Sequence, residues 1–411
     1  MQPFFYHWIF FSQALRGLGG FSLVKKNSFL AGRWKEQGTA LSPPNFSALF
    51  SWVHCWVRQP LCCALEIGSS HGAANYQLHG FFMAGREEEQ GTAPFPPYHQ
   101  PVLPDEVDLW MDAKPGELII DGTLGGGGHS ELFLRKNATV LGIDRDPQAI
   151  EYASNRLRSF GTFFRPFLAN YAEMRQHPGL ADGQLADGQL VDGVLLDLGV
   201  SSHQIDTAER GFSFQKDGPL DMRMGPDAAL SAEQFVNEAS EDELLRALRD
   251  FGEEPQARRI CRLIVERRKK KAFHRTGDLA SCIEQALGRH GRIHPATRTF
   301  QAIRMRVNQE LAMLIKALAE ATACLKPNGR LLVITFHSLE DKIAKHFYQH
   351  HAKPMIDDPT WPAPRENSEN FLSLPVRKAI GPGQKELSIN PRARSAKLRV
   401  ALRNTRPHLP S

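Results

Sequence analysis

Residues 117–130 read Glu-Leu-Ile-Ile-Asp-Gly-Thr-Leu-Gly-Gly-Gly-Gly-His-Ser and join a short apolar run to a glycine-rich turn. The run ends in Asp121, and the glycines after it let the backbone approach a ligand closely and adopt positive φ angles. The helix that we expect behind them offers unpaired N–H groups to a carboxylate or a phosphate. The segment therefore predicts a strand, a ligand-binding turn and a helix in succession.

Further apolar runs follow the same plan along the chain. Two of them end at Asp144 and at Asp197, and another at residues 330–336 follows a predicted helix stop and turn at residues 325–329. Continuous apolar strands between helices are typical of a parallel sheet that is covered on both faces. Ligands of such sheets bind beyond the carboxyl ends of the strands. We therefore expect an α/β fold whose acidic residues meet at that edge.

The chain divides into three predicted regions. Residues 1–97 contain two similar segments and little periodicity, so we interpret them as a poorly ordered extension. Residues 98–205 and 311–405 carry the alternation of strands and helices. Residues 206–310 are highly charged and predicted to be a mostly helical insertion. Within it, Ser240-Glu-Asp-Glu has the spacing of a capping box at a helix start.

Composition excludes several classes of protein. The chain has 411 residues, of which 42% are hydrophobic and 23% charged, so it is neither wholly disordered nor collagenous nor a coiled coil. The net charge of +5 mildly favours a polyanionic partner. The six cysteines show no CxxC pair, which favours a reducing compartment and predicts no metal site. No apolar run reaches the roughly 18 residues that span a bilayer.

Asp144 lies about 20 residues after the glycine-rich turn, where an acidic side chain accepts hydrogen bonds from ribose hydroxyls in dinucleotide and S-adenosylmethionine sites alike. A helix N-cap is the alternative interpretation. The dinucleotide pattern G-x-G-x-x-G, started at Gly125 and Gly127, would require a third glycine where the chain has Ser130. This mismatch weakens the hypothesis of an NAD site without excluding it.

Seven motifs together resemble one family. In chain order they are DGTLGGGGHS at 121–130, IDRDPQAI at 143–150, LLDLGVSSHQIDTAERGFSF at 195–214, DGPLDMRM at 217–224, HPATRTFQAIRMRVNQE at 294–310, FHSLEDKI at 336–343 and NPRARSAKLR at 390–399. These motifs are similar to those of the bacterial ribosomal RNA small-subunit methyltransferase H family. The resemblance implies a class I S-adenosylmethionine-dependent methyltransferase (a Rossmann-like sheet) with a helical insertion domain. It also implies methylation of the N4 amine of a cytidine in the decoding region of 16S rRNA.

The resemblance implies a set of cofactor residues for S-adenosylmethionine. It comprises Gly127, Gly128, His129, Asp144, Tyr171, Asp197 and Gln204. The glycines and His129 are expected at the amino-acid end of the cofactor, and Asp144 at the ribose. Tyr171 matches a position that often carries Phe near the adenine, and a core aromatic is the alternative for it.

Asp197 is the predicted catalytic residue. The N4 amine of cytosine is conjugated with the ring, so its lone pair becomes available when acceptors orient its hydrogens and the nitrogen pyramidalises. Related exocyclic-amine methyltransferases carry a D/N-P-P-Y motif at this strand end, and here Asp197-Leu-Gly-Val lacks both prolines. We hypothesise that Asp197 and the carbonyls after it orient the amine. His337, after another strand end, is expected to have a structural or substrate-positioning role.

RNA contacts are expected in the helical insertion. Phe212 and Phe214 are candidates for stacking on a base that has left its stack, or else they pack the insertion. Residues 257–275 form a basic helical stretch that contains Arg267 and suits phosphate contact or a solvated face. The motif at residues 294–310 contains three arginines whose side chains suit bidentate phosphate binding: Arg298, Arg304 and Arg306.

The resemblance predicts 16S rRNA within the small ribosomal subunit as partner, no membrane, and a cytoplasmic enzyme. A homodimer and a mitochondrial presequence before Glu36 stay open. Two other functions also stay open. One is an NAD-dependent oxidoreductase, and the other is a non-catalytic RNA-binding or ribosome-assembly protein that keeps a vestigial fold.

Overall fold

The computed structural model describes residues 100–181, 190–289 and 294–405. The predicted N-terminal extension, with its two similar segments, lies outside these ranges. Within them, every helix is too short or too polar to cross a lipid bilayer.

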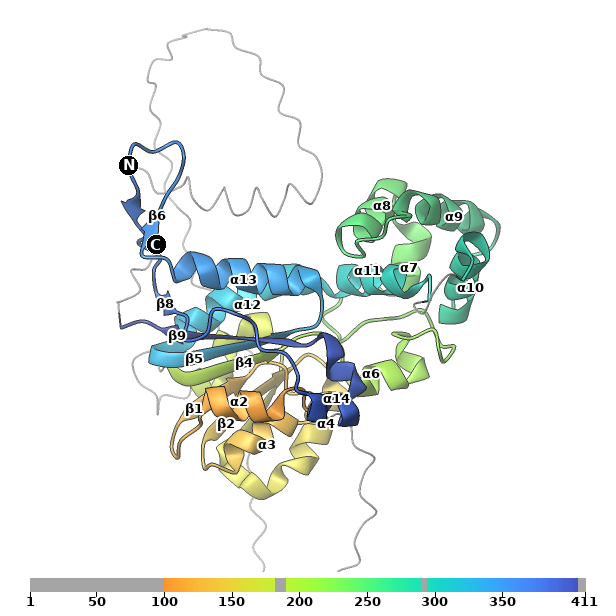
Figure 1. Ribbon diagram of the computed structural model, residues 1–411. Coiled ribbons are helices and arrows are strands. Elements are labelled where there is room, and N and C mark those ends of the chain that lie inside the picture. The colour runs from red at the N-terminus through yellow and green to blue at the C-terminus, as the bar shows by residue number, and fades with distance from the viewer. Residues whose placement is uncertain (1–99, 182–189, 290–293, 406–411) are drawn as a thin grey trace, which may run out of the picture. The chain divides into compact units, whose positions relative to one another are not determined.

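A seven-stranded sheet is the centre of the α/β fold, with the strand order β3-β2-β1-β4-β5-β9-β8 (Figure 1). Its strands are β1 (Leu118–Asp121), β2 (Thr139–Asp144), β3 (Phe164–Leu168), β4 (Val191–Asp197), β5 (Leu325–Thr335), β8 (Leu372–Ser373) and β9 (Lys397–Arg403). Strands β1 to β5 pair in parallel, whereas β9 is antiparallel to both of its neighbours. This order is that of a class I methyltransferase, so the predicted fold class is confirmed.

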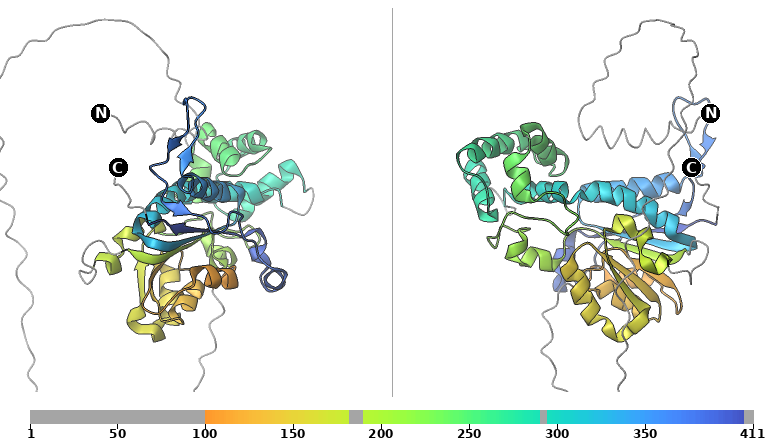
Figure 2. Two further views of the ribbon diagram at one scale, coloured as in Figure 1. Left: turned by 60° about the vertical axis from the view of Figure 1, so that its left-hand side comes forward. Right: turned by 180° about the vertical axis from the view of Figure 1, so that it is seen from behind.

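Helices cover both faces of the sheet (Figures 1 and 2). The larger ones are α2 (Pro104–Met111), α3 (Gly128–Leu134), α4 (Pro147–Arg156), α12 (Glu310–Cys324) and α13 (Ser338–His351). Neighbouring side chains of a strand point to opposite faces. Ile120 therefore packs in the apolar cluster that contains α12 and α13, and Ile119 in the cluster that contains α2, α3 and α4.

The strand order reverses between β1 and β4. After β1 the chain continues outward to β2 and β3, whereas β4 and β5 extend the sheet on the other side. Asp121 is in register with Gly142 of β2 and with Leu195 of β4. Because the three strands run in parallel, Asp121, Asp144 and Asp197 all lie at the same edge of the sheet. Such a reversal is the usual ligand site of an open α/β sheet.

A helical segment lies between β4 and β5 in the sequence. Its helices are α7 (Ala232–Glu238), α8 (Glu241–Asp250), α9 (Ala257–Lys270), α10 (Thr276–Leu287) and α11 (Thr297–Asn308). They share an apolar cluster of their own, in which Leu244 and Leu248 are fully buried. The capping box is confirmed, since Ser240 Oγ accepts the Glu243 N–H at 3.2 Å and Glu243 Oε2 accepts the Ser240 N–H at 3.1 Å.

The remaining elements are short. They are α5 (Pro178–Ala181), α6 (Ser202–Asp206), α14 (Gln384–Ile389), β6 (Met355–Ile356), β7 (Arg365–Glu366) and four 3-10 turns, η1 (Arg158–Phe163), η2 (Tyr171–Gln176), η3 (Ala208–Arg210) and η4 (Pro391–Ser395).

The predicted turn at residues 325–329 is part of strand β5. Leu325 pairs with Val191, and the next pair joins Arg330 to Gly193, so most of the intervening residues bulge out of the ladder. Asn328 takes the left-handed conformation with φ 64°. Helix α12 does stop at Cys324, as expected, but the strand starts at Leu325, the first of the predicted turn residues, rather than after them.

Candidate cofactor and catalytic site

The glycine-rich turn starts the site after β1. Gly125 and Gly127 have φ angles of 50° and 75°, which disfavour any residue with a side chain. Helix α3 begins directly after Gly127. A Cβ atom on Gly128 would lie 3.0 Å from the Pro101 ring, so this turn is also closely packed. The turn therefore presents bare backbone at the carboxyl edge of the sheet.

Asp121 is held beneath this turn. Ser130 Oγ donates a hydrogen bond of 2.7 Å to Asp121 Oδ2, and the Thr123 N–H donates to the other oxygen at 3.3 Å. Burial raises the pKa of Asp121 to about 6. Ser130, which takes the place of the third dinucleotide glycine, thus has a definite role in orienting this acid.

Asp144 is bound to the turn through main-chain groups. Its Oδ2 accepts the Gly125 N–H at 2.8 Å, and its Oδ1 accepts the Asp146 N–H at 2.9 Å. The N-cap of α4 is Asp146, which accepts the Gln148 N–H. Burial raises the pKa of Asp144 to about 6. Asp144 is therefore not the helix cap, and its carboxylate is fixed beside the glycines.

His129 and Asp197 face each other across the edge. His129 Nδ1 lies 3.8 Å from Asp197 Oδ2, and both side chains are almost completely buried. His129 Nε2 lies 2.9 Å from the Val102 carbonyl oxygen and must donate to it, because a carbonyl only accepts. Burial lowers the pKa of His129 to about 4, so at neutral pH its Nδ1 carries a lone pair.

The carboxylate of Asp197 is the least satisfied group of the site. Its Oδ1 is buried and has no hydrogen-bond partner among the residues that the structure describes. Its backbone N–H donates to Thr123 Oγ1 at 2.6 Å, which fixes the strand end. Burial, together with the charges of Asp121, Glu340 and Glu386, raises the pKa of Asp197 well above its usual range. Such a carboxylate is set to receive a cation or an N–H donor.

Gln204 and Tyr171 are the remaining two predicted cofactor residues. Gln204 is buried, forms a capping box with Ser201 at the start of α6, and donates to Asp146 Oδ2 at 2.9 Å. It thus contacts the residue two positions after Asp144, the acid that is predicted to hold the ribose. Tyr171 is partly buried against the sheet cluster, and a Cβ atom on Gly122 would lie 3.3 Å from its Cβ. Tyr171 therefore packs in the core and also lies beside Gly122, the first residue after β1.

One contributor to the site comes from the far end of the sequence. Glu386 of α14 accepts the Leu103 N–H at 2.7 Å through Oε1. The same peptide unit gives the Val102 carbonyl to His129. Glu386 therefore fixes, through one peptide plane, the acceptor that orients His129. No motif signalled this contact, because the partners are 283 positions apart.

A second missed contact ties the Asp144 loop to the helical segment. Arg145 pairs with Asp227, with Nη2 to Oδ2 at 2.7 Å and Nε to Oδ1 at 3.0 Å, and it donates to the Asn308 carbonyl. A Cβ atom on Gly225 would lie 2.1 Å from the Arg145 carbonyl oxygen. This close approach of two backbones explains why glycine is needed at that position.

The prediction that Arg304 binds phosphate is wrong. Its Nε and Nη2 each donate to a carboxylate oxygen of Glu310 at 2.8 Å, and only 16% of its side chain is exposed. The guanidinium thus already holds a bidentate carboxylate. His337 caps α13 and its Nε2 lies 3.0 Å from Glu340 Oε1, and its predicted structural or substrate-positioning role stays a prediction. Glu310, His337 and Glu340 also lie close enough together to be considered as metal ligands.

The other residues proposed to contact RNA are spread over the helical segment. Phe212 and Phe214 are partly buried against its apolar cluster. The centroid of the Phe214 ring lies 4.5 Å from that of His294, in a tilted arrangement, and 4.9 Å from that of Phe300, which it meets edge to face. Arg306 lies over the Phe235 ring. The two phenylalanines thus pack the segment, and nothing in their surroundings points to an exposed stacking platform.

The basic helix α9 keeps cations at its surface. Lys269, Lys270 and Lys271 are exposed, whereas Arg267 lies over the Phe273 ring. An open hollow of about 480 Å³ lies between α9 and α10 and is lined in part by Arg267 and Lys270. Arg298 of α11 is exposed and donates to a main-chain carbonyl. A polyanion can therefore reach several positive charges on this segment.

Comparison with known proteins identifies the family of this chain. The family model of the MraW methylase family matches residues 97–404. A protein of Syntrophus aciditrophicus named Ribosomal RNA small subunit methyltransferase H is 46% identical over 312 residues, which are 74% of this chain and 98% of that protein. Proteins with the same name from Heliobacterium modesticaldum and Caulobacter vibrioides are 43% and 45% identical, over 98% and 96% of their lengths. The family resemblance of the seven motifs is thereby confirmed, and the chain belongs to the MraW methylase family.

Proposed function

We propose that this methyltransferase transfers a methyl group from S-adenosylmethionine to the N4 amine of a cytidine in 16S rRNA, in the decoding region of the small ribosomal subunit. The observation that carries the proposal is the carboxylate of Asp197, which is buried beside the glycine-rich turn with one oxygen unpaired among the described residues. The family and the relatives' names support the class of reaction and the ribosomal RNA.

The residues present fit S-adenosylmethionine. Asp121 and Asp144 have pKa values raised to about 6, and the pKa of Asp197 is raised further. Burial of these carboxyl groups disfavours their ionised form, and a positively charged ligand would recover that free energy. When bound, the cofactor supplies a methyl group on a positively charged sulfur that is already activated for transfer. We assign the ribose hydroxyls to Asp144, as the family resemblance implies, and the amino-acid end to the turn from Gly127 to His129.

Asp197 then acts on the nucleophile. Its unpaired Oδ1 is an acceptor for one hydrogen of the cytosine amine, and the main-chain carbonyls after β4 are acceptors for the other. Holding both hydrogens directs the nitrogen lone pair toward the methyl group and stabilises the positive charge that develops on the nitrogen. Most of the remaining acceleration comes from proximity, with the reacting atoms about 3 Å apart.

His129 acts as a neutral group in this site. Its Nε2–H is committed to the Val102 carbonyl, so its Nδ1 carries a lone pair on the side that faces Asp197. A neutral imidazole does not compete with the cofactor for the carboxylate, as an imidazolium would. We infer that its role is to shape and orient the cofactor end of the site rather than to remove the amine proton.

The helical segment supplies the contacts to RNA in this proposal. Lys269, Lys270 and Lys271 of the α9 terminus are exposed, and together with Arg298 they can contact phosphates. The target base leaves its stack to reach the edge of the sheet. We further infer that the substrate lies within the small ribosomal subunit and that the enzyme works in the cytoplasm. A homodimer stays a prediction.

A labelling experiment tests the proposed function. Purified full-length protein is incubated with methyl-labelled S-adenosylmethionine and with small ribosomal subunits that lack the modification. The proposal predicts label in N4-methylcytidine after digestion to nucleosides. Label in 5-methylcytidine or in another nucleoside would contradict the amine assignment, and cofactor binding without any label would support a vestigial enzyme.

A further inference from the structure

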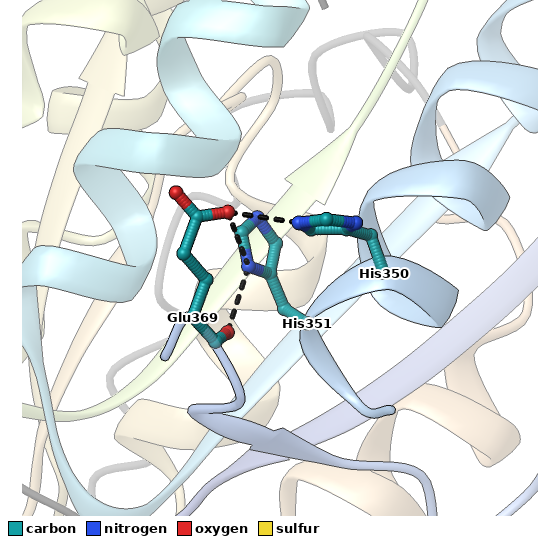
Figure 3. A group of neighbouring side chains, drawn as sticks. All are labelled: His350, His351 and Glu369. Carbon is teal, nitrogen blue, oxygen red and sulfur yellow. Dashed lines mark hydrogen bonds and ion pairs between the residues drawn. The ribbon is translucent and has the colours of Figure 1, made fainter. Parts of the chain in front are cut away.

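Two imidazoles and one carboxylate meet at a place outside the site described above (Figure 3). His350 and His351 are the last two residues of α13, and Glu369 lies in the segment between β7 and β8. One nitrogen of each ring and one carboxylate oxygen all lie within 4.8 Å of one another. We propose that His350, His351 and Glu369 bind one divalent transition-metal ion, for which zinc is the best-suited candidate.

The segment that carries Glu369 is fastened to the end of α13. Asn367 is 2% exposed and donates from Nδ2 to the carbonyl oxygens of His350 at 2.8 Å and Lys353 at 2.9 Å. Its Oδ1 accepts the Glu369 N–H at 3.0 Å. The backbone around Glu369 is therefore ordered by contacts that involve no ion. Less conformational entropy is lost when the carboxylate binds a metal, because its main chain is already in place.

The ring of His351 is held in one orientation. It stacks on Phe371 with centroids 4.2 Å apart and meets the edge of Phe347 at 4.3 Å. Its Nδ1 lies 2.9 Å from the main-chain carbonyl oxygen of Glu369 and donates to it. In a neutral imidazole this leaves the lone pair on Nε2, through which His351 would bind the metal, whereas Nδ1 is the nitrogen that lies 3.9 Å from Glu369 Oε2. Metal-binding histidines typically donate their other ring N–H to a carbonyl or a carboxylate in this way.

His350 completes the cluster from the neighbouring position. Its ring is nearly perpendicular to that of His351, at 86° and 4.8 Å between centroids. Its Nε2 lies 2.8 Å from Glu369 Oε2 (Figure 3). A metal ion replaces the proton that this hydrogen bond shares. The C-terminus of α13 carries partial negative charge from its last carbonyls, which also favours a cation here.

The ligand chemistry favours zinc over magnesium or calcium. Two imidazole nitrogens and one carboxylate oxygen are borderline ligands, whereas the alkaline-earth ions prefer oxygen alone. Zinc–ligand distances of about 2.0–2.2 Å place neighbouring ligand atoms about 3.3 Å apart, so atoms that lie up to 4.8 Å apart approach by up to about 1.5 Å through side-chain rotations. The Glu369 side chain is 51% exposed, so the ion reaches the cluster from solvent and water completes its coordination.

The other candidate group of metal ligands differs in one respect. This group consists of Glu310, His337 and Glu340, and both glutamates are buried. The guanidinium of Arg304 lies 2.8 Å from the Glu310 carboxylate. A cation is thus already present in that cluster as part of the protein. The cluster at the end of α13 is consequently the better place for an added ion.

Metal titration of the full-length protein tests this inference. Zn²⁺ binding is measured by calorimetry and by the shift in melting temperature, and Co²⁺ binding by its visible absorption. The variants are Glu369→Gln and His350→Gln, and the control is His274→Gln, which alters an exposed single pair with Glu233. Because the chain has 16 histidines and 6 cysteines, the comparison uses differences from wild type rather than total bound metal.

We expect both cluster variants to bind one ion fewer, or to bind it at least tenfold more weakly, and to lose the metal-induced rise in melting temperature. The control variant is expected to behave as wild type. His350→Gln leaves the Asn367 contacts in place, so it separates ion binding from folding of the segment. Wild-type zinc affinity, stoichiometry and melting shift in either cluster variant would overturn the inference.

Discussion

Asp197 Oδ2 and His129 Nδ1 lie 3.8 Å apart, and both groups are buried at the carboxyl edge of the sheet. Burial raises the pKa of Asp197 and lowers that of His129, so the uncharged form is favoured on both sides. Asp197 and His129 therefore do not form an ion pair. The pair thus leaves two buried polar groups whose hydrogen bonding a cationic cofactor or an N–H donor would complete.

The first prediction concerns Asp197. Asp197→Asn keeps the shape of the side chain but removes the negative charge and one acceptor from the target amine. We expect methyl transfer to fall about 100-fold or more, as when other charge-stabilising groups are removed. Single-turnover rates at saturating cofactor measure this effect, with Asp192→Asn at the other end of β4 as a control. A wild-type rate would show that Asp197 does not orient the amine.

The second prediction concerns the contact between Glu386 and Leu103. Glu386→Ala removes the acceptor of the Leu103 N–H and releases the peptide that orients His129. A lost hydrogen bond of this kind corresponds to about 1–2 kcal/mol, so we expect the Kd for S-adenosylhomocysteine to rise about tenfold.

Glu386→Gln is the matched variant, because it keeps an acceptor and removes the charge. We expect it to bind within about twofold of wild type, whereas a tenfold loss would mean that the charge itself is needed. Asp105→Asn removes a neighbouring exposed charge and is expected to have no effect. An alanine variant with unchanged affinity would disprove the positioning role.

The third prediction concerns stability. Arg304→Met leaves the buried Glu310 without its partner, which typically costs about 3–5 kcal/mol. Urea unfolding should show this loss in the free energy of unfolding. The double variant Arg304→Met with Glu310→Leu removes both charges, and it should recover most of the loss. Equal stability of the single variant and wild type would mean that the pair contributes little.

The fourth prediction is that folding stability and cofactor affinity change in opposite directions with pH. Asp121 and Asp144 have pKa values raised to about 6 in the folded protein, above their ordinary values near 4. Their contribution to folding stability is therefore fully present below pH 4 and is lost as the pH rises through 6. A cationic cofactor binds the ionised carboxylates, so its affinity should rise over the same interval.

Melting curves between pH 4.5 and 8 measure the predicted fall in folding stability. Calorimetric titrations over the same pH interval measure the predicted rise in cofactor affinity. Asp144→Asn should reduce the slope of each curve. Cofactor affinity that falls as the pH rises from 5 to 7 would contradict the assignment.

The fifth prediction concerns RNA. Reversal of charge at Lys269, Lys270 and Lys271 should weaken binding to ribosomal RNA and flatten its dependence on salt, since each lost phosphate contact lowers the slope by about one. Cofactor affinity should not change. Filter binding across a salt series measures the slope, and Lys342 and Lys345 of α13 are exposed lysines for a control reversal. An unchanged slope would remove α9 from the RNA-binding surface.

The sequence predicts the positions of the strand-end acids well because they depend on local rules. Apolar runs that end in an acid define strand ends, and glycines between a strand and a helix define the turn. Asp121, Asp144 and Asp197 follow from these patterns alone. Their hydrogen bonds to Ser130, Gly125 and Thr123 do not, although each partner lies in the quoted turn.

Other contacts depend on how distant segments meet. Arg304 and Glu310 are six positions apart, which places them on different faces of one continuous helix. The left-handed Gln309, with φ 52°, ends α11 and starts α12, and this break allows the two side chains to pair. Glu386 and the metal-ligand cluster of α13 are likewise invisible to motif spacing. His350 and Glu369 are 19 positions apart and match no zinc-ligand pattern.

The most direct test of the cofactor edge is a crystal structure of the full-length protein with S-adenosylhomocysteine. We predict that the ribose hydroxyls bind Asp144, that the homocysteine lies against Gly127 and His129, and that the sulfur faces the Asp197 side chain. A ligand bound elsewhere on the sheet, or one whose sulfur points away from Asp197, would contradict the account.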